Sequence, residues 1–281
     1  MFVCFTTKAV HIELVSDLTT QSFLNALNRF FDRRGKSAEI YSDNATNFVG
    51  ANNKLKELRQ LFKSELHLNS TKKALADVGV SWHFIPPRSP HFGGLWEAAV
   101  KSMKSLLIKL LGNVNLTFEE LATLLTRAEA CLNSRPLTPI SSDPSDPMCI
   151  TPAHFLVGDS LVAIPEPNLL DVPIYRLTRW RRVTQYSQLL WRRWSTEYLG
   201  QLQERAKWSS RKGPEIRLGT VVLIKEDNIP ALQWRLGVVV SVQQGDDGIV
   251  RVAQVKTSEG LYKRAVRQLC PLPFEGNTDV T

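Results

Sequence analysis

Residues 38–48 read AEIYSDNATNF, a short β-prone run that ends at an acidic residue and continues into polar turn residues. The run Ala38–Ser42 predicts a strand, and Asp43 comes directly after it. A polar helix is expected soon afterwards, over roughly Gly50–Lys63. In α/β proteins, ligands bind at the edge of the sheet where the strands end. This stretch therefore predicts an α/β domain with Asp43 at its ligand edge.

Strand and helix patterns alternate on both sides of this stretch, over the first 157 residues. The predicted strands lie at Phe2–Phe5, His11–Val15 and Ser81–Ile85. The predicted helices run from Leu18 to a stop at Gly35, from Leu95 to Leu111, and from Thr117 to Ser134. Strands and helices in this order predict a mixed sheet covered by helices.

The second half of the chain has a different organisation. Six prolines between Ser141 and Pro173 predict a linker, a long helix is expected over Ile174–Lys207, and short strands follow from Leu218. Strands are expected at Thr220–Lys225, Arg235–Val242, Ile249–Lys256 and Leu261–Val266. About 50 residues of such strands predict a small five-stranded barrel. We expect a core at 1–157, a Pro-rich linker at 158–173, a basic aromatic helical segment at 174–217, an SH3-like β-barrel at 218–273 and a disordered tail at 274–281.

The net charge of +8 is concentrated in one segment. Between Ile174 and Arg217 there are 11 basic and 3 acidic residues, so the rest of the chain sums to zero. Aromatic residues interleave these charges, which suits a surface that meets phosphates and an apolar neighbour. A solvated helix face is the alternative reading. The residues expected to contact phosphate are Arg181, Arg182, Arg192 and Arg193.

Composition excludes several classes of protein. With 43% hydrophobic residues and 12 Phe, 7 Trp and 5 Tyr, most of the 281 residues should fold. No run approaches the ~18 apolar residues of a membrane span, and the first residues do not resemble a signal peptide. Four scattered cysteines without a CxxC pair predict no zinc site and fit a reducing compartment. We therefore expect an intracellular protein of the nucleus or cytoplasm, without a membrane partner.

Two carboxylates stand out by position. Asp43 ends a predicted strand, and Glu97 lies in the first turn of a predicted helix after Gly93-Gly94. Lys101 and Lys104 follow Glu97 on the same helix face. Such a set could hold a hard divalent cation beside a phosphate. The alternatives are an Asp-Asn turn or helix cap, and a glutamate that complements the helix dipole.

Several motifs resemble retroelement integrases, most closely those of BEL/Pao-type retrotransposons. The core motifs are FVCFTTKAVHIELVSDLTT, YSDN, PPRSPHFGGLWEAAVKSMK and LNSRPLTP. The run WRLGVVVSVQQGDDGIVRVAQVKTSEG and the later KRAVRQLCPL resemble the small C-terminal domain of these proteins. The likeness extends from Phe2 to about Pro271.

The resemblance implies a ribonuclease-H-like fold in which an Asp, Asp, Glu triad holds two Mg²⁺ or Mn²⁺ ions for 3′ processing and strand transfer. Asp43 matches the second Asp and Glu97 matches the Glu. DNA would be both substrate and partner, and a homo-oligomer is implied. Asn44 and Asn47 match polar positions beside the site, and Lys101 and Lys104 match a face that grips DNA.

The sequence departs from the family pattern at its start. The first Asp of the triad lies on a strand upstream of the residues that match FVCFTTKA, so the chain as given is expected to be inactive. Asp17 is expected to cap the following helix, with a role as substitute ligand as the alternative.

Three functions follow from these observations. The first is an integrase-type transferase that lacks its first carboxylate here. The second is a non-catalytic DNA-binding or scaffolding protein of the same origin. The third, a ribonuclease H, shares the carboxylates but needs neither the basic helix nor the terminal barrel.

Overall fold

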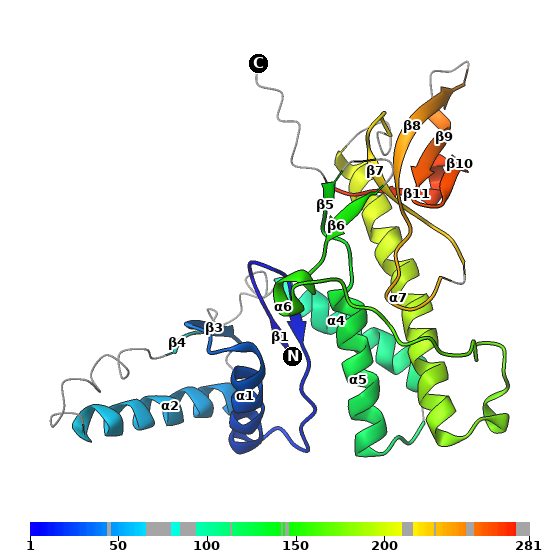
Figure 1. Ribbon diagram of the computed structural model, residues 1–281. Coiled ribbons are helices and arrows are strands. Elements are labelled where there is room, and N and C mark those ends of the chain that lie inside the picture. The colour runs from blue at the N-terminus through cyan, green and yellow to red at the C-terminus, as the bar shows by residue number, and fades with distance from the viewer. Residues whose placement is uncertain are drawn as a thin grey trace, which may run out of the picture. The chain divides into compact units, whose positions relative to one another are not determined.

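The computed structural model (Figure 1) describes residues 1–43, 46–65, 80–84, 94–112, 114–141, 143, 146–209, 216–227, 229–245 and 250–273. The side chains of residues 46, 58–65, 94–102 and 204–209 lie outside this description. The chain forms two compact units: the first holds residues 1–3 and 11–102, and the second holds residues 4–10 and 103–281. Both helices and strands are present, so the chain is a mixed α/β protein.

Helix α1 (Thr20–Arg34) begins two residues after the predicted Leu18 and stops at Gly35, as predicted. The side chain of Thr19 accepts a hydrogen bond from the backbone N–H of Ser22, which satisfies one of the free donors of the first turn. Gly35 ends the helix with a φ of 83°, a value that glycine reaches without strain.

The first unit packs its aromatic side chains around α1. Strands β3 (Glu39–Ser42) and β4 (Ser81–Phe84) pair in parallel, and α2 (Thr46–Glu65) follows β3 and starts earlier than predicted. The ring of Phe23 from α1 lies 4.8 Å from that of Phe48 and 5.8 Å from that of Trp82, between centroids. These rings fix α1 and α2 against the buried face of the β3–β4 pair.

The strands of the first 157 residues form three two-stranded sheets in the described part of the chain. They are the pairs β1 (Phe2–Val3) with β2 (Val10–His11), β3 with β4, and β5 (Thr138–Ser141) with β6 (Met148–Ile150). The strand predicted over His11–Val15 is wrong beyond His11. Its Glu13 side chain is instead enclosed by ion pairs with Arg29 and Arg33. A continuous ribonuclease-H-like sheet stays a prediction.

Two long helices of the second unit, α5 (Phe118–Asn133) and α7 (Arg179–Ser209), pack along each other (Figure 1). Arg179 at the start of α7 binds Glu120 at the start of α5, and the hydroxyl of Tyr198 donates to the carbonyl of Pro136 beyond the end of α5. The two helices therefore run in the same direction. A capping box of Thr117 and Glu120 opens α5.

The segment before α7 differs from the prediction. Residues Ile174–Arg176 form a short 3₁₀ turn, η3, and Leu177 is extended with a ψ of 137°, so the α-helix begins at Arg179 and not at Ile174. The remaining described helices around this region are α4 (Gly94–Leu111), which continues into the second unit, and the single turn α6 (His154–Val157). Within the described residues, no helix is both long and apolar enough to cross a membrane.

The end of the chain forms a five-stranded antiparallel sheet with the order β10-β9-β8-β7-β11. Leu199 and Leu202 of α7 pack on one face, and Val222 and Val255 belong to the core on the other face. Both faces are covered, which explains the unbroken apolar sequence of β7. The elements are β7 (Val221–Ile224), β8 (Leu236–Gln244), β9 (Val250–Thr257), β10 (Gly260–Ala265), the 3₁₀ turn η4 (Val266–Gln268) and the unpredicted β11 (Leu269–Pro271). SH3-like closure of this sheet stays a prediction.

The last residue of α5 and the residue that follows it connect several parts of the second unit. The side chain of Asn133, 1% exposed, accepts from the N–H of Val10 and donates to its carbonyl, both at 2.8 Å. The hydroxyl of Ser134 accepts from the indole N–H of Trp234 at 3.4 Å. These contacts place residues 103–157 in one compact unit with α7 and the sheet, so the predicted linker at 158–173 lies inside that unit.

Candidate functional site

Asp43 lies at the end of β3, as its sequence position predicts. Ser42, the last residue of β3, is buried, and its hydroxyl accepts a hydrogen bond from the indole N–H of Trp82 at 2.9 Å. The same hydroxyl donates to the backbone carbonyl of Asp43 at 2.8 Å. These bonds tie the backbone of Asp43 to β4, so the exposed carboxylate projects from a fixed position.

Polar side chains next to Asp43 share one face of the β3–β4 pair. Tyr41 lies opposite His83 in the register, and their rings stack with centroids 4.7 Å apart. The hydroxyl of Tyr41 donates to Glu39 at 2.9 Å, and this bond raises the pKa of Tyr41 because it favours the protonated phenol. Sequence reasoning did not single out Tyr41 and His83, although the period of two along a strand places residues 39, 41 and 43 on one face.

The other residues predicted for this site are only partly described. Glu97 lies in the first turn of α4, as predicted, but its side chain and that of Lys101 lie outside the described residues, as does all of Asn44. Lys104 is exposed on α4, and Asn47 is half-buried in the first turn of α2. The approach of Asp43 and Glu97 therefore stays a prediction.

A metal-binding arrangement is not complete in the described part of the chain, which contains no group of three or more His, Cys, Asp and Glu side chains placed to hold an ion. Asp43 offers the oxygen ligand that Mg²⁺ and Mn²⁺ prefer. Asp17 accepts hydrogen bonds from the backbone N–H of Thr19 at 2.9 Å and from its hydroxyl at 2.6 Å. Hydrogen bonds from Ser22 and Thr19 hold the pKa of Asp17 at about 2. The N-cap of α1 is therefore Thr19, and the prediction that Asp17 caps this helix is wrong. Asp17 instead holds the capping residue in place through its bonds to Thr19.

The four arginines predicted to contact phosphate have different environments on α7. Arg193 pairs with Glu197 at 3.3 Å, and Arg182 is half-buried and donates to the carbonyl of Leu177 at 3.1 Å. Arg181 and Arg192 are exposed, and neither has a described ion-pair partner. They lie eleven positions apart, which is three helical turns or about 16 Å along one face. These two guanidinium groups are the ones available to a ligand.

Among the described tryptophans of α7, some are buried and one is exposed. Trp191 and Trp194 are buried, and both meet the ring of Trp234 edge-on, with centroids 5.0 and 5.6 Å away. The apolar neighbour predicted for the aromatic residues of this helix is therefore Trp234, which belongs to the same unit. Trp180 has the same angular position as Trp191 but is 66% exposed, because it lies in the first turn of α7.

The first turns of α5 and α7 are joined by a bidentate ion pair. The Nε and Nη2 atoms of Arg179 each donate to a carboxylate oxygen of Glu120 at 2.7 Å. This bonding holds the pKa of Glu120 at about 2 and raises that of Arg179. Arg179 is therefore occupied, and Glu120 is not available to neutralise the neighbouring Arg176 or Arg181.

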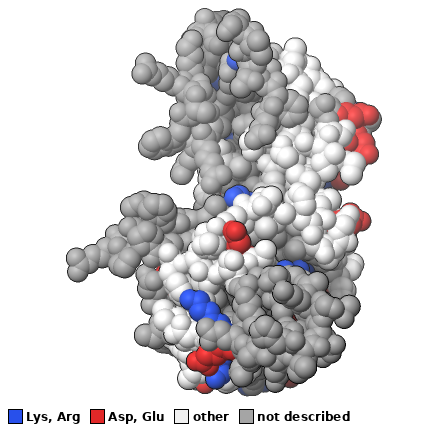
Figure 2. Space-filling view, turned by 90° about the vertical axis from the view of Figure 1, so that its left-hand side faces the viewer, with Lys and Arg blue, Asp and Glu red and all other residues white. Residues whose placement is uncertain are grey.

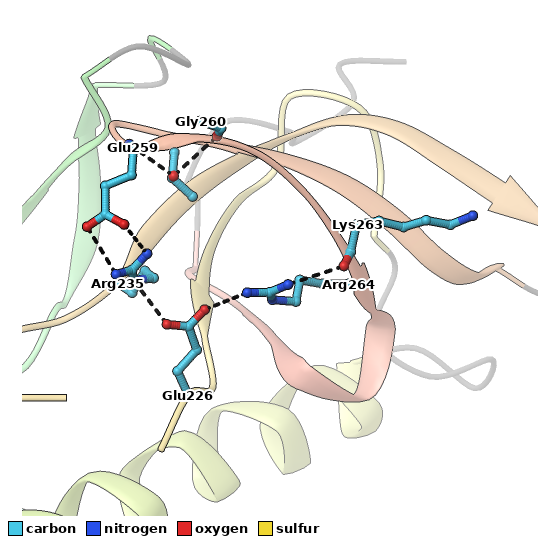
Figure 3. Close-up of polar contacts among 7 residues, drawn as sticks. Glu226, Arg235, Glu259, Gly260, Lys263 and Arg264 are labelled. Carbon is cyan, nitrogen blue, oxygen red and sulfur yellow. Dashed lines mark hydrogen bonds and ion pairs between the residues drawn. The ribbon is translucent and has the colours of Figure 1, made fainter. Parts of the chain in front are cut away.

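Two arginines at the sheet, Arg235 just before β8 and Arg264 in β10, are engaged with acidic residues. Figure 3 shows Arg235 between Glu226 and Glu259, at 3.1 and 2.6 Å, and Arg264 bound to Glu226 at 2.8 Å. On the face drawn in Figure 2, described basic side chains lie singly or in small groups, with acidic side chains among them.

The C-terminal part of the chain matches one family model. Residues 178–272, which form α7 and the sheet, match the model of a family of unknown function (DUF5641). No curated protein matches the chain. A solved structure described as the intasome of simian T-cell lymphotropic virus in complex with PP2A regulatory subunit B56 gamma is similar at a TM-score of 0.32 and 14% identity. The match covers 92% of this chain and 66% of that chain, and at this TM-score it supports no conclusion about fold or function.

Proposed function

We propose that this protein is an integrase-type DNA-binding protein of a retroelement that holds the DNA backbone with exposed arginines of α7. The observation that carries the proposal is the pair Arg181 and Arg192, both exposed and on one face of a helix packed against α5 and the sheet. The sequence motifs that resemble BEL/Pao integrases support the same reading.

The charge around this pair favours a polyanion. Residues 172–196 contain six arginines and no acidic residue. Duplex DNA carries about one negative charge per 1.7 Å of axis, so a rigid row of guanidinium groups gains affinity by releasing condensed counterions. Burial of Trp191 and Trp194 against Trp234 keeps α7 in place while the arginines face solvent.

The first test is the salt dependence of duplex binding by the 281-residue chain and its Arg181→Gln/Arg192→Gln variant. Each lost phosphate contact should reduce the slope of log K against log salt by about 1, so the double variant should lose about 2. Lys109→Gln is the matched control, because it removes an exposed charge from α4 on a different helix face from Lys104. Equal slopes for the double variant and the wild type would contradict the proposal.

We further propose that Asp43 and Glu97 are two carboxylates of the site at which DNA reacts. Asp43 and Glu97 would hold divalent ions there, and such ions would supply activation of the attacking hydroxyl and stabilisation of the leaving oxygen. The fixed backbone at Asp43 supports this role, since a metal ligand must be held in place. A non-catalytic DNA-binding protein is the second candidate, and it is favoured by Asp17, whose carboxylate is engaged with Thr19 instead of lying free as a third ligand.

The second test is Mn²⁺-dependent strand transfer on a branched oligonucleotide, with the chain beside its Glu97→Gln variant. Turnover by the chain that Glu97→Gln loses, with duplex binding retained in both proteins, would support the reacting site, and no turnover from either protein would favour the non-catalytic candidate. Turnover that the variant loses would show that a third ligand exists within these residues. Asp17→Asn would then be the next variant to measure.

A further inference from the structure

Two aromatic side chains at the start of α7 are exposed to an unusual extent. Tyr175 is 75% exposed and Trp180 is 66% exposed, whereas Trp191 and Trp194 of the same segment are at most 5% exposed. Trp and Tyr are large, partly apolar side chains that are enriched where proteins bind partners. A ligand with flat, apolar faces could cover these exposed rings by stacking on them.

The segment that carries these rings is held by the second unit. Leu177, between them, is 4% exposed. The turn η3 is closed by a hydrogen bond from the N–H of Leu177 to the carbonyl of Ile174 at 3.2 Å. The buried amide of Gln185 donates to the carbonyls of Leu169 and Val172, both at 2.7 Å. The rings are therefore presented from an ordered backbone, which lowers the entropic cost of binding.

The charges around the two rings are positive. Arg176 lies over the ring of Tyr175, 5.8 Å from its centroid, and Arg181 directly follows Trp180 and is exposed. The acidic residue bound in this region, Glu120, is occupied by Arg179. A ligand at this place would meet aromatic faces and guanidinium groups together.

We propose that Tyr175, Arg176, Trp180 and Arg181 form a binding surface for single-stranded DNA, on which unpaired bases stack on the rings while the arginines hold the phosphates. This inference rests on the proposed DNA binding by α7 and adds a preference for unpaired over duplex DNA. Every base has a flat π face, but in a duplex these faces are covered by neighbouring base pairs, so exposed rings select an unpaired strand.

A second copy of the chain fits this surface less well. In a symmetric dimer the same patch from both copies comes together, which would bring Arg176 and Arg181 against their own counterparts. No acidic residue occurs between residues 172 and 196 to relieve the repulsion. A polyanion that also carries flat rings meets both requirements of the surface.

The test is fluorescence anisotropy with a labelled 15-nucleotide oligo-dT and a duplex of equal length, using the whole chain. Trp180→Ala should weaken oligo-dT binding roughly 5- to 100-fold, the range for losing one stacked base, and should change duplex binding less than twofold. Trp180→Phe should restore most of the affinity, because a phenyl ring still stacks. Phe155→Ala is the matched control: it removes another exposed aromatic of the second unit and should have no effect.

Three outcomes would overturn the inference. Unchanged oligo-dT affinity in Trp180→Ala, with affinity still lost in Arg181→Gln/Arg192→Gln, would leave the proposed function intact and remove the stacking surface. Equal losses for oligo-dT and duplex would remove the preference for unpaired DNA. A wild-type dimer in sedimentation velocity that Trp180→Ala dissociates would assign the rings to self-association. Absence of any DNA binding by the wild type would instead contradict the proposed function itself.

Discussion

Ion pairs decide which charged side chains of this protein can reach a ligand. Arg179 and Arg193 lie in the basic segment, yet each is paired with a glutamate, while Arg181 and Arg192 stay exposed. An arginine already bound to a carboxylate offers less to a phosphate, because the existing pair must first be broken. Ion pairing therefore distinguishes, within one helix, the arginines that bind a glutamate from the arginines that a ligand can reach.

Glu120→Gln is expected to remove a stabilisation that depends on pH. Hydrogen bonds from Arg179 hold the pKa of Glu120 at about 2, below its ordinary value of 4.5. Because the pKa is depressed in the folded state, the stabilisation is complete above pH 4.5 and is lost as the pH falls towards 2. The wild type should have the higher urea midpoint at pH 6, and the two midpoints should converge near pH 2.

Glu119→Gln provides the control for this experiment, because it removes an exposed carboxylate from the same turn of α5. Its midpoint should follow that of the wild type across the pH range. If Glu120→Gln also followed the wild type, the Arg179–Glu120 pair would be shown not to stabilise the protein.

Among the elements, the last residue of α5 and the residues that follow it join this helix to the N-terminal hairpin, α7 and the sheet. Asn133 binds the backbone of Val10, Pro136 accepts from Tyr198, and Ser134 accepts from Trp234. This explains why the LNSRP motif combines an amide, a hydroxyl and a proline in so few positions. Each side chain or carbonyl satisfies a partner on another element.

Asn133→Ala is expected to lower the free energy of unfolding by about 2–6 kcal/mol, since two buried backbone groups of Val10 lose their partners at about 1–3 kcal/mol each. Urea denaturation followed by circular dichroism measures this loss. Asn115→Ala, at an exposed position between α4 and α5, should change the free energy by less than about 0.5 kcal/mol. A loss below about 1 kcal/mol in Asn133→Ala would mean that other groups or water satisfy Val10.

In the molecule as a whole, the basic segment and the compact units have different boundaries. The net charge of +8 lies in residues 174–217, but those residues share a compact unit with residues 103–157 and with residues 4–10 near the start of the chain. The basic helix is thus embedded in a larger unit, and a domain boundary drawn from composition alone at 158–173 does not coincide with the division by contacts. DNA-binding experiments should therefore use the whole chain.

The local features of the fold follow from residues that are close together in the chain. Thr19 and Gly35 set the ends of α1, Thr117 and Glu120 open α5, and Asp43 follows a strand, because caps, turns and strand ends depend on residues a few positions apart. Helical spacing also placed the tryptophans of α7 on one face.

The partners of these residues, in contrast, depend on how the elements pack. Spacing gives the angle of a side chain on its helix but not where the neighbouring elements end, so Trp191 is buried and Trp180 is exposed. The partners of Glu120 and Asn133 lie 59 and 123 positions away in the sequence. Contacts over such separations depend on how the whole unit packs, and they are what distinguishes an arginine held by the fold from one that can bind DNA.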